Sequence, residues 1–238
     1  MSSILKGKWI APAADKGDVC PMFTKQFALS KELEKATLHL TALGVYVSEI
    51  NGERVGEFVL APGWTCYPKR LQYQTYDVTD LLKEENLLSV TVGKGWYRGR
   101  LPGWQGSKRQ TELQKNPAAV LACLEISYMD GTTETIFSDD SWKVEESRIR
   151  FSEIYDGETY DASFSAAEKQ PVMVYNGPTN TVIPQEGEEV REQETVSPCC
   201  MFTTPAGEVV VDFGQEITGY VEVTVDASAG DEILLSHA

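Results

Sequence analysis

Apolar side chains recur at every second position along much of this sequence, and that spacing indicates β-structure. The segment "ATLHLTA" shows the pattern, because apolar and polar residues alternate strictly from residue 36 to residue 42. Successive side chains of a β-strand point to opposite faces of a sheet, so one face here is apolar and the other polar. We predict a half-buried strand whose core-facing residues are Ala36, Leu38, Leu40 and Ala42.

Turn residues separate these alternating runs at short intervals. Asn51-Gly52 and Asp130-Gly131 suit tight hairpin turns because these residues tolerate a positive φ. One helical turn is predicted, in "VTDLLKEEN", where Thr79 can act as a cap. The sequence therefore predicts an all-β fold, an antiparallel jelly-roll or β-sandwich. A second half-buried strand is predicted in "VLACLEISY". Its core-facing residues are Val120, Ala122, Leu124, Ile126 and Tyr128.

The pattern changes twice along the chain. We expect a β-sandwich over residues 1–165 and a surface connector over 166–200, because four prolines and an acidic run interrupt the alternation there. Alternation resumes in residues 201–238, at Val209, Val211 and Phe213 and again at Val221, Val223 and Val225. Fewer than about forty residues of strand cannot bury a core alone. We expect this segment to be the opening strands of a truncated second β domain.

The charge and the terminal sequence exclude some partners. The formal net charge of −15 produces a field that repels nucleic acid and anionic membrane surfaces. No apolar run approaches the roughly 20 residues that span a bilayer. The first residues, "MSSILKGKWIAP", lack the apolar middle segment of a secretion signal. We therefore expect a cytoplasmic location, with no nucleic acid and no membrane among the partners.

The cysteines and histidines do not match a familiar framework. The five cysteines are scattered and include the adjacent pair Cys199-Cys200, so a disulfide scaffold is not expected. Only two histidines are present, and no Cys-x-x-Cys occurs, so a structural zinc site lacks its usual ligands. We expect no cofactor.

Aromatic residues gather in two turn-rich segments, "APGWTCYPKRLQYQTYDVT" and "GKGWYRG". Their rings suit the apolar faces of sugars, and neighbouring polar groups can fix a sugar's orientation. Tyrosine and tryptophan also fill the rims of sandwiches, so packing is an alternative that the residues leave open. The second segment is predicted to be a turn without a following helix, which does not match a phosphate-binding loop.

Carboxylates are dense in "EIYDGETYDASF", which contains Glu153, Asp156, Glu158 and Asp161. Such a group could supply the acid and base of a glycosidase, or ligands for calcium. The alternative is that Asp156-Gly157 forms a turn whose acids accept backbone N–H bonds.

Taken together, four segments resemble the N-terminal β-sandwich module of bacterial α-L-rhamnosidases: "ALGVYVSEINGERVG", "LAPGWTCYPKRLQYQTYDVTDLL", "VGKGWYRGR" and "IYDGETYDA". The segment "VVDFGQEITGYVEVTV" resembles the start of the next β domain of those enzymes. The resemblance implies a galactose-binding-like sandwich within an inverting glycoside hydrolase that releases terminal L-rhamnose. Its catalytic glutamates are expected in an α/α barrel, which nothing in this sequence matches. Many relatives have Asp where this chain has Cys66, so any ligand contact made by that Asp is lost here. Some modules of this type bind rhamnose beside calcium, so calcium stays open as a cofactor.

Three functions remain open at this point. The first is a non-catalytic accessory domain that braces the catalytic barrel or borders its substrate cleft. The second is a lectin-like module that binds L-rhamnose or rhamnosides, and the third is a self-sufficient hydrolase. No catalytic residue and no metal ligand is assigned. The candidate carbohydrate-binding residues are Trp64, Tyr67, Trp96, Tyr97, Arg98, Trp104, Asp156 and Glu158.

Overall fold

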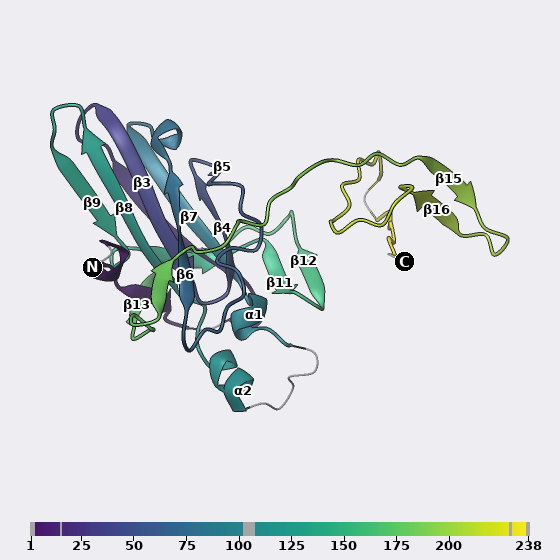
Figure 1. Cartoon of the computed structure of the whole chain (residues 1–238), viewed down its shortest axis with the longest axis horizontal. Helices are drawn as coiled ribbons and strands as arrows, with labels where there is room; N and C mark the ends of the chain where they lie inside the picture. Colours follow the sequence, from purple (N-terminus) through teal and green to yellow (C-terminus); the bar gives the residue numbers. More distant parts are fainter. Residues whose placement is uncertain (1–2, 15, 102–107, 229, 237–238) are drawn as a thin grey trace. The chain divides into compact units, whose positions relative to one another are not determined.

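The computed structural model describes residues 3–14, 16–101, 108–228 and 230–236 (Figure 1). It divides into two compact units, Met1–Glu192 and Gln193–Ala238, and each is described by itself. The helices of the first unit are short: η1 (Ser3–Lys6), η2 (Thr79–Leu81), α1 (Gly95–Arg98) and α2 (Lys108–Gln114). Its strands are β1 (Trp9–Pro12), β2 (Pro21–Ala28), β3 (Leu33–Ala42), β4 (Val45–Ile50), β5 (Glu53–Arg54), β6 (Leu71–Asp77), β7 (Glu85–Gly93), β8 (Val120–Tyr128), β9 (Thr133–Phe137), β10 (Lys143–Glu146), β11 (Ile149–Glu153), β12 (Gly157–Tyr160), β13 (Gln170–Tyr175) and β14 (Val182–Pro184).

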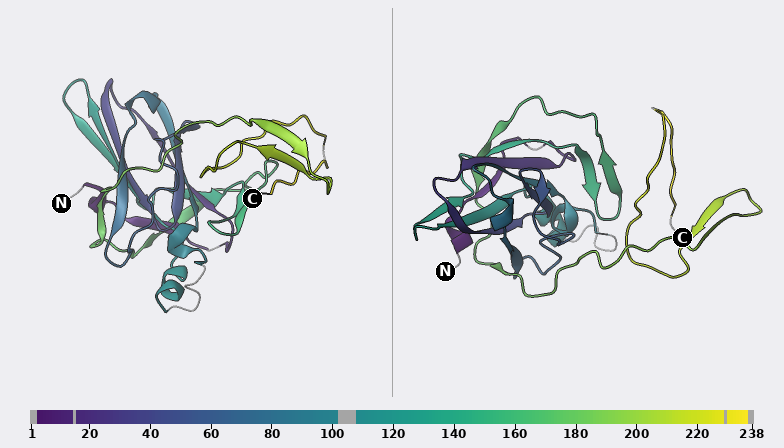
Figure 2. Two further views of the ribbon diagram at one scale, coloured as in Figure 1. Left: turned by 45° about the vertical axis from the view of Figure 1, so that its right-hand side comes forward. Right: turned by 90° about the horizontal axis from the view of Figure 1, so that it is seen from above.

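The predicted antiparallel β-sandwich is confirmed. Most described strands of the first unit join one path in the order β14-β6-β3-β8-β1-β13-β10-β2-β7-β4-β5, with β9 beside β8. Each pairing on that path is antiparallel except that of β14 with β6. Strand β13 pairs with β1 at one end and with β10 at the other, so it connects the two layers of the sandwich. Figure 2 shows the ribbon from two further directions. The hairpin of β11 and β12 forms a separate small sheet.

The predicted core lies between these two layers. Leu38 and Leu40 of β3 and Leu124 of β8 are almost fully buried, together with Val90 of β7 and Phe23 of β2. The period-two prediction is therefore confirmed for the inward face of both predicted strands. Burial of such side chains supplies the main favourable free energy of folding, about 1.5–3 kcal/mol for each.

The opposite face of β8 is also buried, which the alternation did not predict. Leu121 and Cys123 belong to a second cluster that includes Ile4 of η1, Trp9 of β1 and Tyr97 of α1. The N-terminal turn η1 contacts β8 although it lies more than 110 residues earlier in the sequence, and α1 contributes to the same cluster. Strand alternation alone cannot show that a distant segment will cover the outer face.

Part of the expected connector belongs to the sheet. Residues 170–175 form β13 and residues 182–184 form β14, although the sequence predicted a surface connector over 166–200. The two prolines, Pro171 and Pro184, stand in β13 and at the end of β14, in short strands with little local signal. The strands that pair with β13 and β14 lie far away in sequence. Trp9 of β1 is opposite Tyr175 of β13, and Leu71 of β6 is opposite Val182 of β14.

The predicted helical turn is present as η2, but its capping differs from the prediction. Val78 occupies the cap position and makes no side-chain cap hydrogen bond. The Thr79 hydroxyl instead accepts the backbone N–H of Ala36 at 3.0 Å and donates to Asp77 at 2.6 Å. Thr79 therefore connects η2 to β3. The prediction of a single helical turn, with no helix after "GKGWYRG", is wrong, because α1 occupies residues 95–98 and α2 follows at residues 108–114.

The second unit contains one described hairpin, formed by β15 (Cys200–Thr203) and β16 (Val209–Asp212). The predicted strand at Val209 and Val211 is thus confirmed. The strand predicted around Val221–Val225 is not formed among the described residues, whose side chains there are largely exposed. An isolated pair of strands offers no apolar face on which further strands can pack.

Candidate functional site

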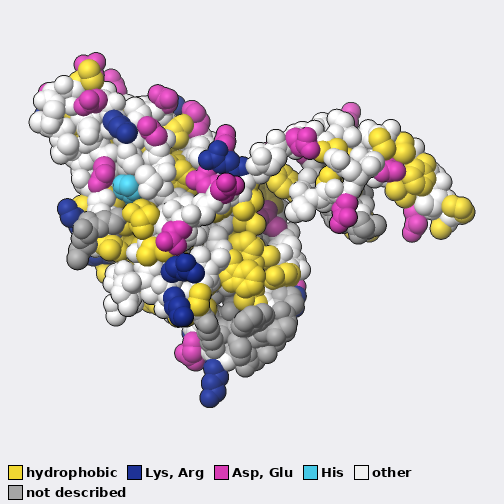
Figure 3. Space-filling view, in the orientation of Figure 1, with side chains coloured by type: hydrophobic (Ala, Val, Ile, Leu, Met, Phe, Trp, Pro, Cys, Tyr) yellow, Lys and Arg dark blue, Asp and Glu magenta, His cyan; other side chains and the backbone are white. Residues whose placement is uncertain are grey.

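Two of the predicted aromatic loops meet at the surface. The rings of Trp64 and Trp96 stack with their centroids 5.9 Å apart and an interplanar angle of 7°. Trp64 is 54% exposed, so part of this pair can be reached from solvent. Hydrophobic side chains gather on the face of the sandwich that carries α1 (Figure 3). We call Trp64 and Trp96 the tryptophan pair.

Gly95 allows α1 to approach β4 closely enough to place Trp96. Its φ of +53° lies in the left-handed region, which L side chains rarely adopt. A Cβ atom at this position would come within 2.5 Å of the Val45 side chain and 2.8 Å of the Val45 backbone nitrogen. Glycine is therefore required both for the backbone conformation and for the contact.

Two further predicted residues lie inside the protein. The rings of Tyr67 and Tyr97 make an edge contact with their centroids 4.9 Å apart, and both side chains are buried. The Tyr67 hydroxyl donates to the carbonyl of Gly63 at 3.2 Å, and Asn116 donates to the Tyr97 hydroxyl at 3.2 Å. Burial raises the pKa of Tyr67 well above its usual range and that of Tyr97 to about 12. Both phenols therefore remain neutral and fill the second core.

The remaining predicted residues are distributed differently. Arg98 is half-buried at the end of α1, and its Nε donates to the carbonyl of Asn116 at 2.7 Å. Glu158 is exposed on β12. Trp104 lies outside the described residues. The structure thus brings Trp64 and Trp96 together at the surface, and places Tyr67 and Tyr97 in one buried cluster.

The carboxylates of "EIYDGETYDA" hold the segment around α1. Glu153 accepts the backbone N–H of Arg100 at 3.0 Å and pairs with Lys94 at 3.1 Å. Asp156 binds the Arg100 guanidinium through both of its oxygens, and that hydrogen bonding lowers the pKa of Asp156. These contacts tie the β11–β12 hairpin to the chain that follows β7. The predicted Asp156-Gly157 turn is present, with Gly157 at a φ of +86°, but Asp156 binds a guanidinium, and the local backbone N–H bond is made by Asp161, which accepts from Ser163 at 2.9 Å.

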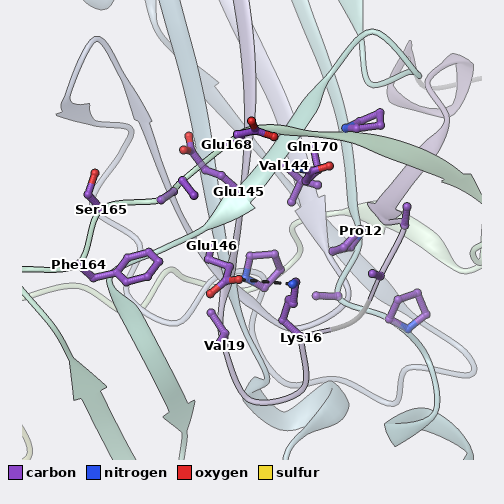
Figure 4. A pocket seen from close by; sticks show the side chains of 18 of the residues that line it. Pro12, Lys16, Val19, Val144, Glu145, Glu146, Phe164, Ser165, Glu168 and Gln170 are labelled. Carbon is purple, nitrogen blue, oxygen red and sulfur yellow. Dashed lines mark ion pairs between the residues drawn. The ribbon is translucent and has the colours of Figure 1, made fainter.

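The first unit also contains a cavity, and Arg98, one of the predicted site residues, is among the residues that line it. Its volume is about 580 Å³, which is within the usual range for small-molecule sites. Its walls come from segments near residues 12–21, 144–146 and 164–171. Lys16 and Glu146 face each other at 3.7 Å (Figure 4). Arg150 also pairs with Glu146 at 2.7 Å and lies 3.9 Å from the Phe164 ring, so Glu146 already has two cationic partners.

One group of three metal-ligating side chains occurs among the described residues. It consists of Cys199, Cys200 and Asp212 in the second unit. The group was not predicted from the sequence, because its cysteines are adjacent and do not have Cys-x-x-Cys spacing. The adjacent cysteine pair, followed by an aspartate on the opposite arm of a hairpin, was the available signal.

None of the helices in the described part of the chain is long and apolar enough to cross a membrane.

The fold and the surface together define a class of protein. This is a β-sandwich domain with two stacked tryptophan rings, one on the loop before β6 and one on α1, and exposed aromatic rings suit the apolar face of a sugar. Residues 31–194 match the family described as the α-L-rhamnosidase N-terminal domain, and residues 202–238 match the bacterial α-L-rhamnosidase concanavalin-like domain. The chain belongs to the family of α-L-rhamnosidase N-terminal domains, and the resemblance found in the sequence is confirmed.

Individual relatives agree with this assignment. An α-L-rhamnosidase of Streptomyces avermitilis is 36% identical over 98% of this chain, which covers 23% of that protein. The crystal structure of the Aspergillus terreus α-L-rhamnosidase matches with a TM-score of 0.77 and 35% identity, over 88% of this chain and 26% of that one. The Streptomyces avermitilis enzyme complexed with L-rhamnose matches with a TM-score of 0.72 and 33% identity, over 83% and 20%. The chain thus spans about a quarter of the length of these relatives.

Proposed function

We propose that this chain is the non-catalytic accessory β-sandwich of an α-L-rhamnosidase, and that it braces the catalytic part or borders its substrate cleft. The enzyme as a whole would hydrolyse terminal α-L-rhamnosides. The observation that carries the proposal is that two of the four "EIYDGETYDA" carboxylates are held in ion pairs, Glu153 with Lys94 and Asp156 with Arg100. Glycoside hydrolysis requires one carboxyl group that stays protonated near neutral pH. The pKa values of Asp156 and Asp161 are instead lowered, chiefly by hydrogen bonds from Arg100 and Ser163.

An assay with an aryl α-L-rhamnoside tests this proposal. The 238-residue chain is expected to show no turnover above a buffer blank, with an intact α-L-rhamnosidase as the positive control. Turnover that disappears in Glu153→Gln, Asp156→Asn, Glu158→Gln or Asp161→Asn would contradict the proposal. It would favour the self-sufficient hydrolase instead.

A second candidate function is weak binding of L-rhamnose or rhamnosides at the tryptophan pair. The exposure of Trp64 against Trp96 favours it, because a flat indole face suits the C–H groups of a sugar ring. Titration with L-rhamnose is expected to shift the indole N–H signals of this pair, with a dissociation constant near about 1 mM. Trp64→Ala should abolish the shifts. Trp142→Phe removes a buried tryptophan and is the control, because it should leave the shifts of the tryptophan pair unchanged. Unchanged signals at tens of millimolar sugar, on the order of ten times that constant, would leave only the bracing role.

The partners that we propose are the remainder of the enzyme and its carbohydrate substrate. A cytoplasmic location remains part of the proposal, and it is based on the sequence alone. Localisation of a tagged full-length protein by cell fractionation tests it.

A further inference from the structure

Three metal-ligating side chains meet on the hairpin of the second unit. The sulfur atoms of Cys199 and Cys200 and a carboxylate oxygen of Asp212 all lie within 4.8 Å of one another. The Cys200 sulfur is 4.0 Å from Oδ2 of Asp212. A tetrahedral zinc site brings sulfur and oxygen ligands about 3.5–4 Å apart, given metal–ligand distances of about 2.0–2.3 Å. Small side-chain rotations therefore suffice to place one cation among the three.

The backbone holds these residues in place. Cys200 and Asp212 are direct partners across β15 and β16, and the N–H of Cys199 donates to the Asp212 carbonyl at 2.8 Å. The N–H of Gly214 donates to Oδ1 of Asp212 at 2.7 Å. That bond occupies one carboxylate oxygen and leaves Oδ2 beside Cys200. Hydrogen bonds of this kind orient the ligands of metal sites.

A cation at this position would also relieve a concentration of negative charge. Among the described residues, Asp212 has no ion pair with Lys or Arg, and the whole chain carries a net charge of −15. Thiolate ligands select soft or borderline cations such as Zn²⁺ and Cd²⁺ over Mg²⁺ and Ca²⁺. Three protein ligands leave the fourth tetrahedral position open to water.

We propose that Cys199, Cys200 and Asp212 form a site for one thiophilic divalent cation, of which Zn²⁺ is the representative. The cysteines lie between the two family-matched segments of the sequence, and Asp212 lies within the second. The bound cation would join the residue before β15 to both strands of the hairpin. Binding therefore stabilises a two-stranded unit that is marginal by itself.

The test is a metal titration of the 238-residue chain, kept reduced with a phosphine. Zn²⁺ is titrated in competition with a chromophoric chelator, and Cd²⁺ is followed by its sulfur-to-metal ultraviolet absorption. We expect one equivalent to bind with a dissociation constant below about 1 µM. A large excess of Mg²⁺ or Ca²⁺ should not displace it, and hydrogen exchange of residues 200–212 should slow on binding.

Variants identify the ligands. Cys199→Ser and Cys200→Ser should each weaken binding at least about 100-fold, and Asp212→Asn about 10-fold with the Cd²⁺ absorption retained. Cys66→Ser, a thiol in the first unit, is the matched control and should leave binding unchanged. The proposal is overturned if no equivalent binds, if Ca²⁺ competes, or if binding survives both cysteine substitutions. All four positions lie at exposed or half-buried sites, so the substitutions should not prevent folding.

Discussion

At the scale of single residues, position in the fold decides whether an aromatic side chain packs or faces solvent. Trp64 and Tyr67 lie three residues apart on one loop, yet Trp64 is 54% exposed and Tyr67 is buried. Trp96 and Tyr97 are adjacent on α1, and only the tyrosine is fully within the second core. Of the two alternatives that the sequence left open, packing is realised at Tyr67 and Tyr97, whereas Trp64 is exposed and a sugar surface there remains a proposal.

Gly95→Ala is expected to destabilise the fold more than Gly131→Ala does. Both glycines have a positive φ, at +53° and +79°, and such a conformation costs an alanine about 1 kcal/mol. Only Gly95 also lacks room for a Cβ atom, because Val45 is in the way. Urea unfolding measures the difference, and near-UV circular dichroism should report loss of the tryptophan stacking in Gly95→Ala alone. Equal destabilisation by the two variants would show that the close approach to β4 is unimportant.

Leu124→Ala is expected to lower the free energy of unfolding by about 2–5 kcal/mol, because it leaves a cavity between the layers. Leu124 is 1% exposed. Met129, just beyond the end of the same strand, is 62% exposed, so Met129→Ala should change stability by less than about 0.5 kcal/mol. Chemical denaturation monitored by tryptophan fluorescence compares the two. A loss below half a kcal/mol for Leu124→Ala would refute its place in the core.

At the scale of elements, charged contacts fasten short segments that have little core of their own. The β11–β12 hairpin forms a separate sheet, and its Glu153 and Asp156 bind Lys94 and Arg100 on the chain around α1. A two-stranded hairpin is marginal alone. Glu153 and Asp156, which are candidate catalytic acids in the sequence, thus hold this hairpin against the chain around α1, which contains Trp96.

The attachment of the β11–β12 hairpin is expected to weaken in acid. The hydrogen bond from Arg100 lowers the pKa of Asp156 below its ordinary value of 3.8. A carboxyl group with a lowered folded-state pKa stabilises the fold above its unfolded pKa, and this contribution disappears as the pH falls through the folded pKa. Carboxyl ¹³C titration should give Asp156 a midpoint below that of an unfolded aspartate. In Arg100→Gln the midpoint should return to the ordinary value, and an identical midpoint in both proteins would contradict the ion pair.

At the scale of the whole first unit, β13 closes the sandwich. It pairs with β1 in one layer and with β10 in the other, and it buries Val172 between them. The 166–200 segment therefore contributes to the fold in addition to joining it to the second unit.

A chain of residues 1–165 is expected to be less stable than one of residues 1–192. Without β13 and β14 it loses the burial of Val172 and Val182, each worth about 1.5 kcal/mol or more, and the pairing that joins the layers. Urea unfolding should show a free energy at least about 3 kcal/mol lower, and a broader transition. Equal stability of the two chains would mean that β13 is dispensable.

The sequence alone determined the elements whose signals are local. The alternation at Leu38 and Leu124 predicted two central strands and their inward faces, because a pleated strand alternates its side chains whatever surrounds it. The Asn51-Gly52 and Asp130-Gly131 turns could also be predicted locally, because these residue types tolerate a positive φ. Asn51, Gly52 and Gly131 all adopt one. The ordered motifs also indicated the family, which the family match over residues 31–194 confirms.

Only the tertiary structure decided what depends on contacts between distant residues. β13 became a strand because β1, more than 150 residues earlier, offered it a free edge. Leu121 was buried because η1 packs against β8 in the second core cluster. Cys200 met Asp212 because a hairpin aligned them. The local sequence around a residue does not show which distant segment will pack over it. Burial is a property of the assembled surface, and the local pattern limits it without fixing it.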